Sequence, residues 1–201
     1  MKKELFAKII GGKYRGKKIK LPPKEITRSS KNVLRESLFN ILQFDVLDKN
    51  FIEVFGGSGS VGLEALSRGA KHIYFIEINK ESYNVLSKNI TLLDKNSCTL
   101  LFGDAFEKIF DIIKELQIKK EKGYFYFDPP FSIREGMKDI YNKVFKLIEK
   151  IPTEVCEMVI IEHMTNIELP ERINKFKLIK QKKFGKSSLS FYNLELDFEK
   201  E

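Results

Sequence analysis

The sequence EVFGGSGSVG at residues 53–62 is the most informative stretch of the chain, because it places a glycine-rich loop directly after a short apolar segment. Residues 51–55 predict a β-strand, and the residues beyond the loop predict a helix that ends at Gly69. Glycines permit a tight turn and let a ligand approach the backbone, while amides at a helix N-terminus favour anionic groups. The stretch therefore predicts a strand–loop–helix unit that binds a ligand.

Strands and helices alternate along the chain after this unit. Four further apolar segments predict strands, with amphipathic helices between them, and two more strands joined at Gly185 and Lys186 follow. This order predicts an α/β fold with a mostly parallel sheet, helices on both faces and a closing antiparallel pair. The predicted strands are 72–77, 98–102, 124–128 and 158–163, and the predicted helices are 80–93, 106–117 and 141–151.

The N-terminal residues follow a different pattern, which predicts an extension over 1–45 and a main domain over 46–201. Residues 8–21 predict a β-hairpin whose apolar residues alternate with lysines. Residues 30–43 predict an amphipathic helix. Its apolar residues at helical spacing are Val33, Leu34, Leu38, Ile41 and Leu42.

The net charge of +8 is concentrated at the N-terminus. Residues 1–31 contain eleven Lys or Arg and two Glu, whereas the remaining 170 residues contain 25 basic and 26 acidic residues. A local positive surplus on a patterned segment is typical of a surface that binds a polyanion. A solvated charged tail is the simpler alternative, which the pattern makes less attractive.

The composition excludes several other classes of protein. No apolar run approaches the roughly 20 residues needed to cross a bilayer, and no apolar stretch of signal-peptide length follows the charged start. We therefore expect a cytoplasmic protein without a membrane partner. Cys98 and Cys156 are expected to be free thiols, and with His72 and His163 they lack the spacing of zinc ligands, so no metal is expected.

The glycine loop also matches the fingerprint of a dinucleotide-binding site. Gly57, Gly59 and Gly62 have the G-x-G-x-x-G spacing, and Glu77 follows about 20 residues later. Glu53 counts against a nicotinamide or flavin enzyme, because it interrupts a strand that is normally apolar at this point.

The motif FDPPF at residues 127–131 ends the predicted strand 124–128 and carries chemistry that hydride transfer does not need. Ligands of open α/β sheets bind beyond the carboxyl ends of the strands, so the Asp128 carboxylate should face the cleft. The two prolines stiffen the turn and lack N–H groups, which leaves the Asp128 carboxylate and the Pro129 carbonyl as acceptors for an exocyclic amino group. Phe131 offers a face on which a base can stack.

These motifs together resemble the class I methyltransferases that modify exocyclic amines, which have a Rossmann-like, seven-stranded, mostly parallel sheet with an antiparallel last strand. More narrowly, the chain resembles the RsmD family of bacterial 16S ribosomal RNA guanine-N2 methyltransferases over nearly its full length. The resemblance is carried by IIGGKYRGKKIKLP, Arg28, RESLFN, GLEALSRGA and FDPPF. The chain departs from the family at residues 29–31, where a proline and threonines are usual, and at Gly56, where alanine is usual.

The resemblance implies S-adenosyl-L-methionine as cofactor and assigns roles to matching residues. Glu77 should accept from the ribose hydroxyls, and Asp104 from the adenine amino group, although Asp104 can also cap a helix. The implied cofactor-binding residues are Glu53, Phe55, Gly56, Gly57, Ser58, Gly59, Glu77, Ile78, Asp104, Ala105 and Phe106. The implied catalytic residues are Asp128, Pro129, Pro130 and Phe131. The implied RNA-binding residues are Lys13, Tyr14, Arg15, Lys17, Lys18, Lys20, Arg28 and Arg35.

The expected partner is 16S ribosomal RNA, free or within the small ribosomal subunit, and the expected protein is a monomer. A DNA amino-methyltransferase and a non-enzymatic RNA-binding assembly factor remain as alternatives. A hydrolase triad of Ser58, Asp128 and His163 lacks the G-x-S-x-G nucleophile elbow. We interpret His163 as a strand-end residue facing solvent or a satisfied core residue, and Glu162 as structural.

Overall fold

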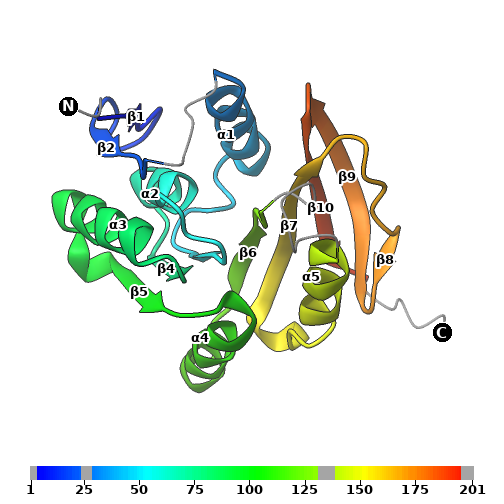
Figure 1. Ribbon diagram of the computed structural model, residues 1–201. Coiled ribbons are helices and arrows are strands. Elements are labelled where there is room, and N and C mark those ends of the chain that lie inside the picture. Colours follow the sequence, from blue (N-terminus) through cyan, green and yellow to red (C-terminus); the bar gives the residue numbers. More distant parts are fainter. Residues whose placement is uncertain (1–3, 24–28, 131–138, 196–201) are drawn as a thin grey trace.

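A computed structural model describes residues 4–23, 29–130 and 139–195, and its centre is an eight-stranded sheet (Figure 1). The strand order is β5-β4-β3-β6-β7-β10-β9-β8, and β3 to β7 are all parallel to one another. The strands are β3 (Asn50–Glu53), β4 (His72–Glu77), β5 (Cys98–Phe102), β6 (Gly123–Phe127), β7 (Cys156–Met164), β8 (Arg172–Ile173), β9 (Phe176–Phe184) and β10 (Ser187–Leu194).

Helices cover both faces of the parallel part of this sheet, so the central strands β3 and β6 are buried along their full length. Along β3, Phe51 faces α1, α2 and α3, whereas Ile52 faces α4 and α5 (Figure 1). The helices are α1 (Ser29–Leu42), α2 (Ser60–Ser67), α3 (Lys80–Leu93), α4 (Ala105–Lys119) and α5 (Ile140–Ile148), with short 3-10 turns η1 (Lys95–Ser97) and η2 (Thr153–Val155). None of the helices described is long and apolar enough to cross a membrane.

The predicted α/β architecture is confirmed, including the antiparallel pairing of β10 with both β7 and β9. The structure adds the two-residue strand β8, which is too short to leave a pattern in the sequence. Val33 is 55% exposed, so its expected place on the buried face of α1 is wrong. The stripe that packs consists of Leu34, Leu38 and Leu42, which repeat every four residues on one face of the helix.

The N-terminal extension forms the predicted hairpin, with β1 (Phe6–Lys8) antiparallel to β2 (Lys18–Lys20), and packs on α2 and α3 (Figure 1). Glu64 of α2 is completely buried, and its two carboxylate oxygens accept from the amides of Ile10 and Gly11, each at 2.8 Å. The same carboxylate pairs with Arg68 at 2.9 Å and with Arg35 of α1 at 3.8 Å. One buried acid therefore joins the hairpin, α1 and α2.

Two further contacts fix the hairpin. Asn89 of α3 accepts from the Lys20 amide at 2.9 Å and donates to the Lys20 carbonyl at 2.8 Å, as a neighbouring strand would. Gly12 has φ +74°, and a Cβ added there would lie 1.8 Å from the Ser67 carbonyl oxygen. Only glycine allows this close approach between the hairpin turn and the end of α2.

We predict that Glu64→Ala releases the hairpin and lowers the free energy of unfolding by about 3–5 kcal/mol, because it leaves Arg35 buried without its carboxylate. Urea denaturation measures the loss, and limited proteolysis measures release of the hairpin. Glu36→Ala, which removes an exposed acid from α1, is the matched control. Equal urea midpoints for the two variants would contradict this role for Glu64.

Candidate functional site

Four carboxylates gather at the carboxyl edge of the sheet. Glu53 ends β3, Glu77 ends β4, Asp104 follows β5 by two residues, and Asp128 directly follows β6. Because these four strands are parallel neighbours, the acids lie along one edge, where open α/β sheets bind their ligands.

The glycine loop between β3 and α2 is held tightly against β4. The Gly56 amide donates to the Ile76 carbonyl at 2.8 Å, and the Gly59 amide donates to the Gly56 carbonyl at 2.7 Å. Gly59 has φ +76°, and a Cβ there would lie 2.3 Å from a methyl group of Leu86. At Gly62 a Cβ would lie 2.5 Å from the Phe75 ring. These two glycines serve the close packing of the loop and α2, a role in addition to the ligand approach expected of the loop.

Glu53 and Ser58 hold the loop from within the protein. Glu53 is 4% exposed, and its Oε2 accepts from the Gly62 amide at 2.7 Å. Ser58 is 2% exposed, and its carbonyl accepts from the Asn89 side chain at 3.0 Å. Both residues therefore position the loop that the sequence assigns to cofactor binding.

Glu77 and Asp104 are fixed by backbone amides. Glu77 accepts from the Gly57 amide at 2.7 Å and from the Asn79 amide at 2.6 Å. Asp104 caps α4 by accepting from the Phe106 amide at 2.9 Å, so its expected capping role is confirmed. A carboxylate oxygen can accept more than one hydrogen bond, so both acids retain capacity for a ligand.

Apolar surface accompanies these two acids. Ile78 is 63% exposed directly after Glu77. Phe106 contacts Phe55 edge to face with ring centroids 6.0 Å apart, and Ala105 is buried at the start of α4. Acceptors beside exposed apolar surface suit a nucleoside, whose hydroxyls and amino group donate while its ring packs on side chains.

Asp128 is paired with a lysine from the N-terminal extension. Nζ of Lys31, in the first turn of α1, lies 3.0 Å from Oδ2 of Asp128, and the two side chains are 45% and 23% exposed. Pro129 is buried and Pro130 is half-buried, whereas Phe131 lies outside the described residues. From the sequence we considered only backbone donors to Asp128 and did not predict the Lys31 side chain as a donor. The feature of the sequence that points to Lys31 is the departure of residues 29–31 from the family pattern.

A second, buried acid lies behind Asp128. The Tyr126 hydroxyl donates to Oε2 of Glu162 at 2.5 Å, and these side chains are 0% and 2% exposed. Burial and, next, the negative charge of Asp128 raise the pKa of Glu162 to about 7, against the opposing effects of Lys31 and the Tyr126 hydrogen bond. The signal in the sequence is an acid inside the apolar strand MVIIEH.

His163 is a satisfied core residue, as one of its two interpretations states. It is completely buried, and its ring nitrogens lie 2.9 Å from the Ser190 hydroxyl and 2.9 Å from the Met164 carbonyl. These contacts argue against a catalytic triad with Ser58 and Asp128.

Most of the basic residues expected to bind RNA are on the surface of the hairpin. Lys13, Arg15, Lys17 and Lys18 are exposed, while Lys20 is half-buried and pairs with Glu4. Tyr14 is half-buried, its amide donates to the Ser67 hydroxyl at 2.9 Å, and the Lys13 ammonium lies 5.0 Å from its ring centre. Arg28 lies outside the described residues.

Arg35 requires a correction. It is 3% exposed, and its guanidinium donates to the Lys8 carbonyl at 2.6 Å and to the Ser60 carbonyl at 3.2 Å. Together with its pairing to Glu64, this position argues against the phosphate contact expected of it. Arg35 lies three residues before Leu38 and seven before Leu42, so the helical periodicity of the buried stripe was the signal.

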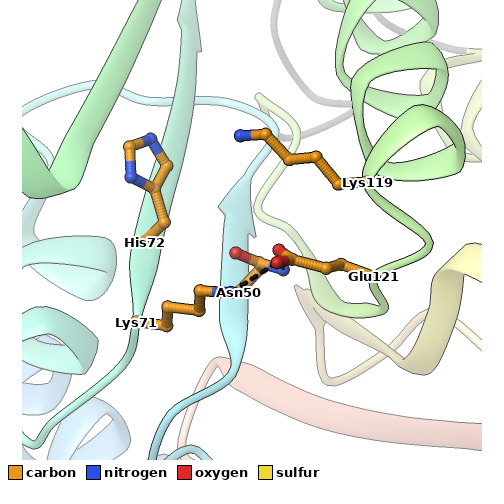
Figure 2. A pocket seen from close by; sticks show the side chains of 5 residues that line it. All are labelled: Asn50, Lys71, His72, Lys119 and Glu121. Carbon is orange, nitrogen blue, oxygen red and sulfur yellow. Dashed lines mark hydrogen bonds and ion pairs between the residues drawn. The ribbon is translucent and has the colours of Figure 1, made fainter.

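A pocket of about 390 Å³ lies at the opposite, amino-terminal edge of the sheet (Figure 2). Its lining comes from the starts of β3 and β4 and from the end of α4, and Glu121 there accepts from Lys71 and from Asn50. It is separate from the carboxyl edge. Within the described segments, no cluster of three His, Cys, Asp or Glu has the arrangement of a metal site. The lining residues are Asn50, Lys71, His72, Lys119 and Glu121.

Comparison with known proteins identifies the family of this chain. The family model described as Conserved hypothetical protein 95 matches residues 7–193. Ribosomal RNA small subunit methyltransferase D of Haemophilus influenzae is 34% identical over 151 residues, covering 75% of this chain and 70% of that protein. The Escherichia coli protein of the same name is 29% identical over 189 residues, covering 94% and 90%.

Solved structures agree with the fold. The yhhF protein of Escherichia coli, described as a candidate methyltransferase, superposes with a TM-score of 0.72 at 26% identity, covering 94% of this chain and 98% of that one. A candidate methylase of Haemophilus influenzae gives a TM-score of 0.68 at 25% identity, covering 94% and 99%. The fold is therefore the class I methyltransferase fold, and the chain belongs to the Conserved hypothetical protein 95 family, the RsmD family.

Proposed function

We propose that this protein transfers a methyl group from S-adenosylmethionine to the exocyclic N2 of a guanine in 16S ribosomal RNA. The observation that carries the proposal is the Asp128-Pro129-Pro130 turn at the end of β6, on the same sheet edge as the glycine loop. The relatives named ribosomal RNA small subunit methyltransferase D support the choice of substrate. Fold alone would leave it open, because one fold serves many functions.

The carboxyl edge fits the proposed cofactor. When bound, S-adenosylmethionine supplies a methyl group activated by a positively charged sulfur. Glu77 would accept from its ribose hydroxyls, and Asp104 would accept from its adenine amino group beside Ile78 and Phe106. The amides of the loop at the start of α2 would bind the methionine carboxylate, since a helix N-terminus favours anions.

Asp128 would make the amine of the base reactive. The nitrogen lone pair of a guanine N2 is delocalised into the ring, so this amine is a poor nucleophile. The Asp128 carboxylate and the Pro129 carbonyl can accept hydrogen bonds from its two N–H groups, orient it and stabilise the positive charge that develops on nitrogen as the methyl group leaves the sulfur. The nitrogen then loses one proton, to Asp128 or to water. Lys31 must move or share Asp128 when the base enters, because it binds Oδ2 in the structure described.

The hairpin would bind the phosphate backbone. Lys13, Arg15, Lys17 and Lys18 project from it, and α1 connects this extension to Asp128 through Lys31. We propose a cytoplasmic monomer that acts on 16S ribosomal RNA, free or within the small subunit.

The cofactor assignment can be tested at Glu77. Glu77→Ala should weaken binding of S-adenosylmethionine by about 1.5–3 kcal/mol, because it removes a charge-assisted hydrogen bond. Calorimetry with S-adenosylmethionine and with NAD measures this. Glu81→Ala, which removes an exposed acid four residues later, should bind normally. Binding of NAD in place of S-adenosylmethionine by the unmodified protein would refute the cofactor assignment.

The role of Asp128 can be tested by substitution. Asp128→Ala should lower kcat by about 10²–10³-fold, the usual cost of removing one group that stabilises developing charge, and should leave cofactor binding nearly intact. Steady-state methyl transfer with saturating substrates measures kcat, and Asp139→Ala, at the exposed start of α5, is the control. Asp128→Asn keeps an acceptor without the charge, so activity in Asn but not in Ala assigns Asp128 to orientation. Normal turnover in Asp128→Ala would place the reaction elsewhere.

The role of the hairpin in RNA binding can be tested by removing its exposed charges. Replacing Lys13, Lys17 and Lys18 by Gln should weaken RNA binding and flatten its salt dependence by up to about 0.7–0.9 log units per lost phosphate contact. Cofactor affinity should not change. Replacing the exposed β9 residues Lys180, Lys182 and Lys183 by Gln removes the same charge from another surface. Equal losses in the two triple variants would show that charge alone matters and would contradict a specific role for the hairpin.

A further inference from the structure

A buried acid stands directly behind Asp128 and has no role in the mechanism given above. Glu162 is on β7, next to β6, and the paired residues Phe127 and Ile161 immediately precede Asp128 and Glu162. Glu162 lies on the sheet face covered by α1, because Tyr126, which binds it, and Ile160, two residues earlier on β7, belong to the core under that helix. The two acids therefore occupy neighbouring positions at the ends of adjacent parallel strands.

The hydrogen bonding of Glu162 is incomplete. Its Oε2 accepts from the Tyr126 hydroxyl, but its buried Oε1 has no hydrogen-bond partner among the residues described. Buried polar atoms in folded proteins are nearly always paired, so an unpaired carboxyl oxygen beside a reactive group calls for an explanation. A purely structural acid would be expected to satisfy both oxygens.

The titratable groups that face Glu162 come from β6, α1 and α5. Asp128 and Tyr126 approach from β6, Lys31 from α1 and Tyr141 from α5. Across the ladder, β10 contributes the uncharged Leu189, and His163 is bound to Ser190. Among the described residues, Asp128 and Lys31 are therefore the charged groups that shift the pKa of Glu162, Asp128 upward and Lys31 downward.

We propose that Glu162 is a positioning residue of the methyl-transfer site, a second carboxyl that acts through Asp128 to set the negative charge facing the amine. This inference rests on the proposed function of the Asp128 turn. Glu162 makes no bond to the substrate in this account. Its charge is added to that of Asp128 when the nitrogen becomes positive, and Tyr126 holds its carboxyl in place.

Because the pKa of Glu162 is about 7, the role of this residue should be visible in how kcat depends on pH. Below this pH Glu162 is protonated and neutral, and above it the ionised form adds negative charge behind Asp128. Because that charge stabilises a cationic nitrogen, kcat should rise as the pH increases through about 7. The Tyr126 hydrogen bond lowers the pKa of Glu162, so its loss should move the rise to higher pH.

The test is the pH profile of kcat from pH 6 to 8.5, measured with saturating labelled S-adenosylmethionine and 16S ribosomal RNA that lacks the modification. Glu162→Gln should abolish the rise and lower kcat at pH 8 by roughly tenfold, the effect of one pKa unit of interaction. Glu157→Gln, on the same strand, should keep the profile of the unmodified protein. Tyr126→Phe should retain the rise but shift its midpoint to higher pH, which a merely structural role would not do.

The outcomes separate this inference from the proposed function. Absence of methyl transfer by the unmodified protein would overturn the function itself. An active protein whose profile is the same in Glu162→Gln would overturn the role of Glu162. If Glu162→Gln fails to fold, as judged by circular dichroism and cofactor binding, Tyr126→Phe decides alone, and an unshifted midpoint would overturn the inference.

Discussion

The buried carboxylate of Glu64 is the interaction on which the arrangement of this protein depends. It accepts from two amides of the hairpin and pairs with Arg35 and Arg68, so the hairpin, α1 and α2 meet at one group. A buried charge is stable only when it is paired and fully hydrogen-bonded, which makes the fit between these elements stringent. Because α1 is fixed in this way, Lys31 in its first turn reaches Asp128.

The fold and the location of the site were predictable from the sequence because they follow from local patterns. Apolar segments of five or six residues gave the parallel strands, and β4, α3 and β5 have the predicted bounds. Acids and glycines at strand ends then indicated the carboxyl edge, since parallel strands end together. The sequence alone therefore predicted that Glu53, Glu77, Asp104 and Asp128 lie along one edge of the sheet.

What the sequence did not reveal depends on partners that are distant along the chain. Arg35 was grouped with the basic N-terminal residues that are expected to bind phosphate. Glu64, 29 residues away, nevertheless holds it in the core. Lys31 and Asp128 are separated by 97 residues, and Tyr126 and Glu162 by 36. Local periodicity cannot show such pairs. Gly59 was expected to serve a ligand, but the side chain that requires a glycine there is Leu86 of α3.

We propose that a basic hairpin, a cofactor-binding sheet edge and an amine-binding turn work together in one enzyme that acts on ribosomal RNA. The measurement that tests this most directly is transfer of labelled methyl from S-adenosylmethionine to total nucleic acid from cells that lack the protein, followed by nucleoside analysis. We predict that the label appears in 16S ribosomal RNA as N2-methylguanosine. Label in DNA, or in another nucleoside of the RNA, would contradict it.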